Sequence, residues 1–191
     1  MKKLVAATHN AGKLKEMEKL LGDFEILSVG EFDGGAEPDE TGATFRENAL
    51  IKARAAYAIS GLPSFGDDSG ICVDALDGAP GVYSARYAAT PKLCNLKLLD
   101  ALKDVPEEKR GAHFACCIAY CDGEREFTVE GRCEGRILFA ETGDGGFGYD
   151  PLFYSEDLKK SFGEAEMAEK SAVSHRGRAL GLFKEKLSEL K

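Results

Sequence analysis

The chain has 191 residues, with 25 lysines and arginines against 33 aspartates and glutamates, which gives a formal net charge of −8. Apolar side chains make up 43% of the chain, enough to form a core, so a disordered chain is excluded. The acidic balance argues against non-specific binding to nucleic acid or to a membrane surface, and no apolar run approaches the ~20 residues of a membrane-spanning helix. The apolar stretch that ends at Thr8 is too short for a signal peptide. We therefore expect one domain, residues 1–191, located in the cytoplasm.

The first part of the chain predicts two strands around a helix. Residues 3–8 are mostly apolar and predict a buried strand. Residues 11–21 place their apolar side chains on one face of a helix, and residues 25–29 predict a second strand. A polar loop over residues 30–42 follows, with four glycines and five carboxylates.

A capped helix and a pair of apolar runs come next. Thr44 is a suitable N-cap residue and Glu47 completes a capping box, so we expect a helix that ends at Gly61-Leu62-Pro63. Residues 64–76 contain two short apolar runs on either side of Asp67-Asp68-Ser69-Gly70.

Helices alternate with strands early in the chain and hairpins dominate its middle, a mixture that favours an α/β protein with a mixed sheet. The further predicted elements are a helix from Thr90-Pro91, a hairpin of residues 113–121 and 124–129, a strand at 133–139, a glycine-rich loop at 141–150 and a helix from about His175.

The cysteines show no pattern typical of a metal site or a disulfide framework. None forms a C-x-x-C pair, and no histidine stands at zinc-finger spacing from them. We expect reduced thiols, several of them buried, at Cys72, Cys94, Cys116, Cys117, Cys121 and Cys133.

The polar segment of residues 8–13 could bind an anion. Backbone N–H groups at a helix N-terminus carry partial positive charge, and Thr8, Asn10 and Lys13 add side-chain donors. The segment is not a P-loop, because Leu14 stands where the metal-binding serine or threonine would be. The alternative is a helix cap with a solvated lysine.

Two groups of carboxylates could hold a metal ion. In an extended backbone Asp67 and Asp68 point to opposite faces, and their oxygens suit magnesium, which commonly bridges substrate phosphates. The alternative is an aspartate turn at a strand end. Taken with Asp68, Glu40 is a further candidate ligand. Lys52 lies two turns into the helix that also carries Asn48, and it could face phosphate.

Two segments near the carboxyl end add further binding groups. In the segment of residues 143–151, Gly143, Gly145 and Gly148 match G-x-G-x-x-G, but no strand-to-helix unit surrounds them, which argues against a dinucleotide fingerprint. Phe147 in this loop could stack on a ligand, unless the segment is a plain connection with an anchoring aromatic ring. Lys170 and Ser174-His175-Arg176 are donors next to the last helix, although His175 could also cap that helix or be exposed.

In this order and spacing the segments resemble the inosine triphosphate pyrophosphatase family, which acts on non-canonical purine nucleoside triphosphates. The resemblance runs from the first predicted strand to the last helix. It rests on Thr8–Lys13, Glu40–Phe45 with Glu47–Ala49, Asp67–Gly70, Gly81–Arg86, Gly146–Asp150 and Ser174–Arg176. The chain departs from the family pattern around Ala165-Glu166-Met167 and in a short stretch after Arg86.

The resemblance implies an elongated mixed β-sheet with flanking helices, two lobes around a central cleft, and a homodimer. It implies hydrolysis between the α- and β-phosphates of ITP, dITP or XTP, which gives a monophosphate and pyrophosphate and cleanses the nucleotide pool. It implies Mg²⁺ as cofactor, held by Glu40 and Asp68, with Asp68 also the general base for the attacking water.

The resemblance also implies how the nucleotide is bound. Lys13 and Lys52 would supply local positive charge for the triphosphate, and Phe147 would stack on the purine. Hydrogen-bond donors near the last helix would bind the O6 oxygen of a purine. They would discriminate against adenine, which carries an amino group at that position. The implied substrate-binding residues are Thr8, His9, Asn10, Ala11, Gly12, Lys13, Lys52, Ser69, Phe147, Gly148, Tyr149, Asp150, Lys170, His175 and Arg176.

Two other functions stay open. One is a nucleotide pyrophosphatase that acts on modified pyrimidines, against which the donors at Lys170 and residues 174–176 favour a purine. The other is a nucleotide sensor without turnover. Asp68 and Glu40 argue against a sensor, because a binding protein needs no base for an attacking water.

Overall fold

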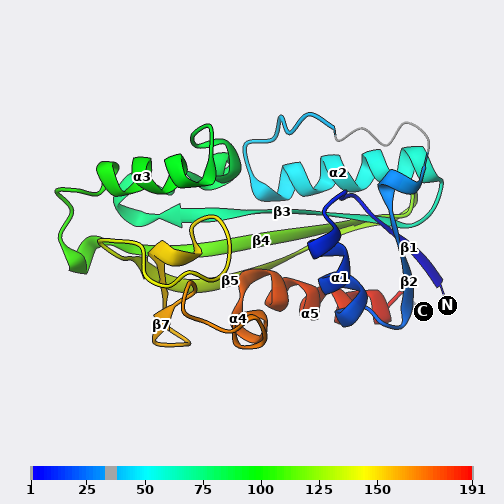
Figure 1. Ribbon diagram of the computed structural model, residues 1–191. Helices are drawn as coiled ribbons and strands as arrows, with labels where there is room; N and C mark the ends of the chain where they lie inside the picture. The colour runs from blue at the N-terminus through cyan, green and yellow to red at the C-terminus, as the bar shows by residue number, and fades with distance from the viewer. Residues whose placement is uncertain (1, 33–37, 191) are drawn as a thin grey trace. The chain divides into compact units, whose positions relative to one another are not determined.

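The protein is described here by a computed structural model, over residues 2–32 and 38–190 (Figure 1). In these residues seven strands form one sheet in the order β2-β1-β3-β4-β5-β6-β7. The strands are β1 (Lys2–Ala6), β2 (Phe24–Ser28), β3 (Ser64–Val73), β4 (Gly111–Cys121), β5 (Glu126–Ile137), β6 (Phe153–Ser155) and β7 (Lys160–Ser161). The helices are α1 (Ala11–Leu20), α2 (Phe45–Ser60), α3 (Pro91–Ala101), α4 (Met167–Val173) and α5 (His175–Ser188).

The strand directions confirm a mixed sheet and the α/β class. β1 pairs in parallel with β2 and with β3, whereas β6 pairs antiparallel with both β5 and β7. Among the described residues, none of the helices combines the length and the apolar character needed to cross a membrane.

The chain divides into two compact units. The first consists of Met1–Asp68, Cys116–Gly131 and Ala179–Lys191, and the second of Ser69–Ala115 and Arg132–Arg178. Each unit has its own apolar core. The two lobes around a central cleft that the resemblance implies stay a prediction.

In the first unit, alternate residues of β4 pack against helices on opposite faces of the sheet (Figure 1). Ile118 belongs to the core cluster that includes residues of α1 and α5, such as Met17 and Phe183. Cys117 and Ala119 pack with Ala49 and Ala53 of α2. This period of two is the one that a strand buried on both faces requires.

Helix α2 begins and ends where the sequence predicts. The Thr44 side chain accepts a hydrogen bond from the Glu47 backbone, and the Glu47 side chain completes the capping box. The helix ends at Gly61, which takes the left-handed conformation with φ 66° that favours glycine at this position.

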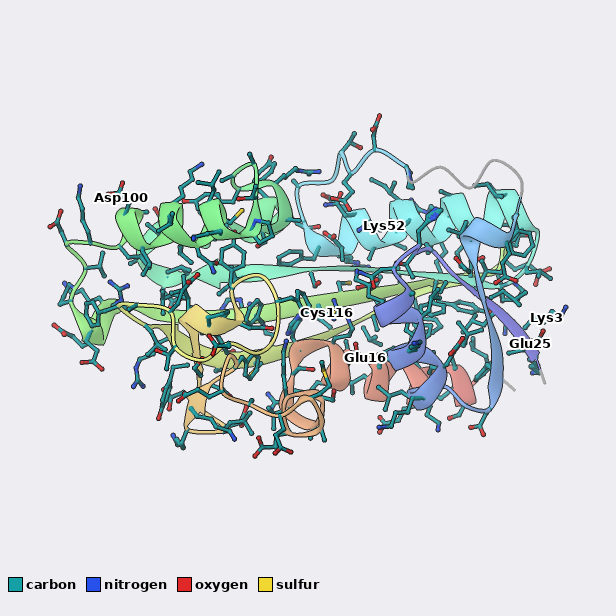
Figure 2. The ribbon with its side chains drawn as sticks, in the orientation of Figure 1. Lys3, Glu16, Glu25, Lys52, Asp100 and Cys116 are labelled. Carbon is teal, nitrogen blue, oxygen red and sulfur yellow. The ribbon has the colours of Figure 1, made fainter. Side chains whose placement is uncertain are left out.

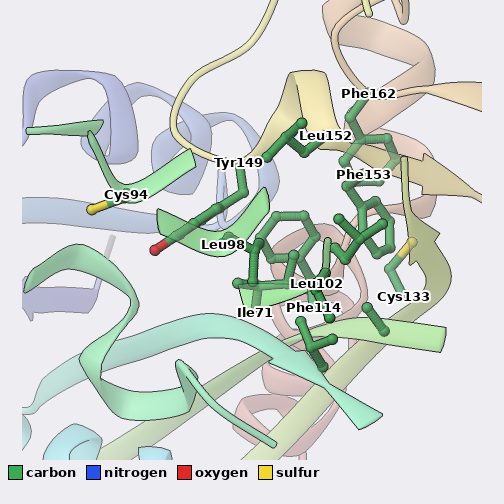
Figure 3. Close-up of a cluster of buried hydrophobic side chains, with 13 residues drawn as sticks. Ile71, Cys94, Leu98, Leu102, Phe114, Cys133, Tyr149, Leu152, Phe153 and Phe162 are labelled. Carbon is green, nitrogen blue, oxygen red and sulfur yellow. The ribbon is translucent and has the colours of Figure 1, made fainter. Parts of the chain in front are cut away.

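The second unit is built around an aromatic core (Figure 3). Phe114 of β4 packs edge-on against Phe153 at 4.7 Å between ring centroids, and Phe162 stacks on Phe114 at 6.1 Å. Leu98, in the last turn of α3, and Leu102, just after the end of that helix, complete this core.

Two sequence predictions need correction, and one helix was missed. The apolar runs around Asp67 and Asp68 form one continuous strand, β3, so these aspartates do not make a turn at a strand end. The predicted strand at 133–139 is the second half of β5, which continues from the hairpin to Ile137. The short helix α4 was not predicted, and part of the predicted loop 30–42 lies outside the described residues.

None of the six cysteines, all of which lie in the described residues, takes part in a disulfide bond. Five are buried, and Cys72 is partly exposed. Burial raises the pKa of Cys117 to about 12 and that of Cys133 to about 11. A low-dielectric environment disfavours the thiolate, so these thiols serve as small apolar groups of the core.

Candidate functional site

The first unit holds a compact group of polar side chains around Asp68, which we call the Asp68 cluster: Glu40, Asn48, Lys52 and Asp68. Lys52 Nζ lies 2.9 Å from Asp68 Oδ1 and 2.5 Å from Glu40 Oε1. Asn48 Nδ2 donates a hydrogen bond to Asp68 Oδ2 at 3.2 Å. Each oxygen of the Asp68 carboxylate therefore has its own donor.

The packing of α2 on β3 brings this cluster together. A Cβ atom on Gly66 would lie 2.6 Å from Lys52 Cβ and 2.8 Å from the Ala49 carbonyl oxygen, so only glycine allows the helix to approach this closely. Asn48 and Lys52 are four residues apart and share one face of the helix. That face lies over β3 two residues beyond Gly66, at Asp68 (Figure 2 labels Lys52).

The surroundings change the proton affinity of both charged groups. Burial raises the pKa of Asp68 above its ordinary value, against the opposing effects of the Lys52 charge and of the hydrogen bonds from Lys52 and Asn48. Burial alone would lower the pKa of Lys52, but the charges and hydrogen bonds of Asp68 and Glu40 raise it. Lys52 thus remains an ammonium ion, and Asp68 is a stronger base than an exposed aspartate.

The neighbouring aspartate faces a different lysine. Lys13 Nζ binds both oxygens of Asp67, at 2.9 and 3.1 Å, and the Asp67 side chain is only 2% exposed. Asp67 and Asp68 therefore point to different partners, as adjacent residues in an extended strand do. Lys13 is therefore paired with a buried carboxylate and is only partly exposed, which differs from the fully solvated lysine of the alternative interpretation.

The 8–13 segment itself forms a helix cap. Asn10 is the N-cap residue of α1, and its side chain accepts hydrogen bonds from the backbone N–H groups of Gly12 and Lys13, at 2.9 and 3.1 Å. Thr8 is buried and accepts from the Asn10 backbone, while His9, Ala11 and Gly12 are exposed. An anion bound here would have to replace the Asn10 side chain at those two N–H groups.

The Asp68 cluster fits a hard divalent cation by the chemistry of its donors. Two carboxylates, from Glu40 and Asp68, converge on one cationic position, which the Lys52 ammonium occupies. Among the described residues, no group of three or more histidine, cysteine, aspartate or glutamate side chains is arranged to hold a metal. Two carboxylates with water and substrate oxygens are the set that Mg²⁺ commonly takes.

The second unit holds another buried ion pair, which with Phe147 forms what we call the Asp150 cluster: Phe147, Asp150 and Lys170. Lys170 Nζ lies 2.5 Å from Asp150 Oδ2, and the same oxygen accepts the Phe147 backbone N–H at 2.7 Å. The ammonium also lies 4.6 Å from the centre of the Phe147 ring. The ring is 66% exposed, so it can stack on a planar ligand.

Three other predicted residues of this unit, Tyr149, His175 and Arg176, are buried and contact neighbouring residues. His175 stacks on Phe114 at 4.8 Å, with 13° between the ring planes, and Arg176 donates to Ser69 Oγ at 3.4 Å. Tyr149 donates its hydroxyl hydrogen bond to the Ser84 carbonyl. Tyr149 is thus a buried anchor for the loop and is less suited to contact a ligand.

A second anchor of this loop is Asn95 of α3. Its Nδ2 donates to the Gly148 carbonyl at 3.1 Å and to Glu141 Oε1 at 2.7 Å. Sequence reasoning missed Asn95, and it assigned no role to Asn48 or to the pairing of Asp67 with Lys13. The spacing of Asn48 and Lys52, four residues apart on one helix, was the one available signal.

Comparison with known proteins identifies the family. A model of the Ham1 family matches residues 4–186. The chain belongs to the Ham1 family. A dITP/XTP pyrophosphatase of Desulforamulus reducens is 50% identical over 194 residues, covering 98% of this chain and 96% of that protein. A dITP/XTP pyrophosphatase of Pseudomonas aeruginosa is 49% identical, with 98% of each chain covered.

Solved structures agree with this family. A HAM1 protein from Coxiella burnetii has a TM-score of 0.93 and 41% identity, covering 99% of this chain and 100% of that one. A nucleoside-triphosphatase, or dITP/XTP pyrophosphatase, of Mycobacterium abscessus has a TM-score of 0.82 and 41% identity over 95% and 98% of the two chains. The resemblance drawn from the sequence segments is thereby confirmed.

Proposed function

We propose that this protein hydrolyses deaminated purine nucleoside triphosphates, ITP, dITP and XTP, to the monophosphate and pyrophosphate. The observation that carries the proposal is the Asp68 cluster, in which a buried carboxylate is held at both oxygens by Asn48 and Lys52. The names of full-length relatives at about half identity supply the substrate class.

The charged side chains near Asp68 do not have enough positive charge to attract a triphosphate without a cation. Lys13 and Lys52 provide two positive charges, but Asp67, Asp68 and Glu40 provide three negative ones. A polyanion that approaches these groups meets no net attraction. We therefore propose that a divalent cation, Mg²⁺, accompanies the substrate and is held by Asp68 and Glu40. When bound, it neutralises phosphate charge and polarises the phosphoryl oxygens.

Asp68 is the proposed general base. A carboxylate whose pKa is raised by burial takes a proton from water more readily than an exposed one, and Asn48 and Lys52 fix its orientation. Asp68 would orient the water that attacks the α-phosphorus and accept its proton at one carboxylate oxygen, while the bond from the α-phosphorus to the bridging oxygen breaks and pyrophosphate leaves. Lys52 and Lys13 would then leave their carboxylate partners in part to bind phosphate oxygens.

The Asp150 cluster is the proposed binding site for the nucleobase. The Phe147 ring would stack on the purine, and the Lys170 ammonium keeps N–H groups beyond the one that binds Asp150. Such a donor matches the O6 oxygen of hypoxanthine and xanthine and is mismatched to the amino group of adenine. His175 and Arg176 are proposed to add further donors.

We also propose the homodimer that the family resemblance implies. Exposed apolar side chains on the second unit, Tyr83, Leu93 and Leu96, are compatible with an interface. Light scattering at micromolar concentration checks this proposal, and a mass of one chain throughout would contradict it. Location in the cytoplasm likewise stays a prediction.

A nucleotide panel tests the proposed function. The protein is mixed with MgCl₂ and ITP, dITP, XTP, ATP, GTP or modified pyrimidine triphosphates, and the products are identified by chromatography. We expect monophosphate and pyrophosphate from ITP, dITP and XTP, and little turnover of ATP. Preferred cleavage of a pyrimidine would favour the first alternative function. Tight binding without any product would favour the sensor.

A further inference from the structure

We propose that Asn48 is a positioning residue that fixes Asp68 and the Glu40 loop (residues 40–42) relative to each other. This role rests on the proposed function, in which Asp68 is the base. Asn48 lies on α2, four residues before Lys52, and is fully buried. It would act through Asp68 and the loop, without itself contacting substrate.

The two ends of the Asn48 amide have different partners. Nδ2 donates to Asp68 Oδ2 at 3.2 Å, and Oδ1 accepts the backbone N–H of Gly42 at 2.8 Å. A reversed amide would place its oxygen against a carboxylate and its N–H₂ against a backbone N–H, so only one orientation satisfies both contacts. One buried side chain thus joins the strand that carries Asp68 to the loop that carries Glu40.

The loop is shaped for this contact. A Cβ atom on Gly42 would lie 2.6 Å from Asn48 Oδ1 and 2.9 Å from the Asn48 backbone nitrogen. Glycine therefore lets the loop backbone reach the amide. Glu40 stands two residues earlier, and its carboxylate lies 2.5 Å from Lys52 Nζ.

Two side chains of one helix donate hydrogen bonds to the Asp68 carboxylate. Lys52 holds Oδ1 at 2.9 Å and Asn48 holds Oδ2, which fixes the plane of the carboxylate. Lys52 would be recruited in part by the substrate phosphates, whereas Asn48 carries no charge and would keep its hold. Loss of Asn48 would leave the carboxylate free to rotate and the loop untethered, and misplacement of a reacting group by ~1 Å can cost ~10²-fold in rate.

Two variants separate the contacts. Asn48→Ala removes both, and we expect kcat for XTP to fall at least ~10-fold and the Mg²⁺ concentration for half-maximal activity to rise several-fold, with KM for XTP little changed. Asn48→Asp keeps an acceptor for the Gly42 N–H but sets a carboxylate against Asp68. We expect it to lose kcat as well, while hydrogen exchange of the Gly42 amide stays slow, as in the wild type; in Asn48→Ala that exchange becomes fast.

The matched control is Ala53→Gly. It lies on the same helix, is buried, and weakens the helix without touching Asp68. If Asn48→Ala matches Ala53→Gly in kcat and Mg²⁺ requirement, Asn48 has only a structural role and the proposal is overturned. Wild-type kcat in Asn48→Asp would also overturn it. A wild-type chain that releases no pyrophosphate would overturn the proposed function first, and the positioning role with it.

Discussion

Each lysine beside the aspartate pair is already bound to a carboxylate. Lys13 holds Asp67 across 54 residues of sequence, and Lys52 holds Asp68 and Glu40. The sequence alone shows that these charged side chains belong to segments that resemble a family pattern. It cannot identify the pairs, because the partners meet only once β3 lies between α1 and α2. A substrate phosphate would therefore compete with the carboxylates of Asp67, Asp68 and Glu40 for both lysines.

Replacement of Asp68 by asparagine tests the proposed base. The change is nearly isosteric, so the fold should persist, but an amide cannot accept the proton of water. We expect kcat for XTP at saturating Mg²⁺ to fall by ~10²–10⁴-fold, the usual contribution of a general base. Steady-state kinetics and a thermal melt measure the two effects. A variant that keeps more than about a tenth of wild-type kcat would exclude Asp68 as the base.

Replacement of Lys170 by methionine tests how the protein recognises the nucleobase. The variant keeps much of the aliphatic stem and removes the ammonium that lies 2.5 Å from Asp150. We expect kcat/KM to fall for ITP and to change little for ATP, which we expect to be a poor substrate of the wild type as well. Because Asp150 then loses a buried partner, the variant should also be less stable, and a melt must accompany the kinetics.

Lys13→Met is the comparison for Lys170→Met. A lysine that binds phosphate carries no information about the base, so this variant should weaken ITP and ATP by equal factors. Equal losses on both nucleotides in Lys170→Met would move Lys170 from base recognition to phosphate binding.

At the level of elements, the ends of α2 were predictable and the continuity of β3 was not. Thr44, Glu47 and Gly61 act locally, so their capping roles can be read from the sequence. The Asp67-Asp68-Ser69-Gly70 stretch has residues that are rare in strands. It stays extended because Lys13 and Lys52 compensate the buried carboxylates, and those contacts are long-range. Likewise, the turn at Gly123 marks the hairpin, but nothing local shows that β5 runs on past Gly131.

The contact between α2 and β3 can be tested with Gly66→Ala. The added Cβ would lie 2.6–2.9 Å from atoms of Lys52, Ala49 and Ala53, two of them backbone atoms, so the helix must shift. We expect a loss of stability of about 1–3 kcal/mol, typical of overpacking, together with a fall in kcat as Asn48 and Lys52 move relative to Asp68.

Gly181→Ala is the control for Gly66→Ala. A Cβ atom at Gly181, within α5, would meet nothing within 4 Å, and alanine favours the helix, so stability should stay equal or rise by up to about 1 kcal/mol. Urea unfolding measures both variants. A Gly66→Ala protein as stable and active as the wild type would contradict the close packing of α2 on β3.

For the whole molecule, the buried thiols predict weak alkaline stability. Burial raises the pKa of Cys117 from 9.0 to about 12, so the native state binds its proton more tightly than the unfolded chain. This stabilisation is complete below about pH 9 and is lost as the pH rises towards 12, at up to about 1.4 kcal/mol for each pH unit. Urea unfolding from pH 8 to 11 should show the decline.

Cys117→Ala provides the check on this decline. The variant lacks the titrating thiol, so its stability should fall less steeply with pH, even if the smaller side chain lowers stability at every pH. Some decline should persist, because burial also raises the pKa of Tyr120 to about 12. Identical slopes for the wild type and Cys117→Ala would show that the thiol does not contribute.

The most direct test of the whole account is turnover of XTP with Mg²⁺ in water enriched in ¹⁸O, followed by mass spectrometry of both products. Water activated by Asp68 attacks the α-phosphorus in this account, so the label should appear in the monophosphate and the released pyrophosphate should be unlabelled. Label in pyrophosphate or in inorganic phosphate, or no turnover of XTP at all, would contradict it.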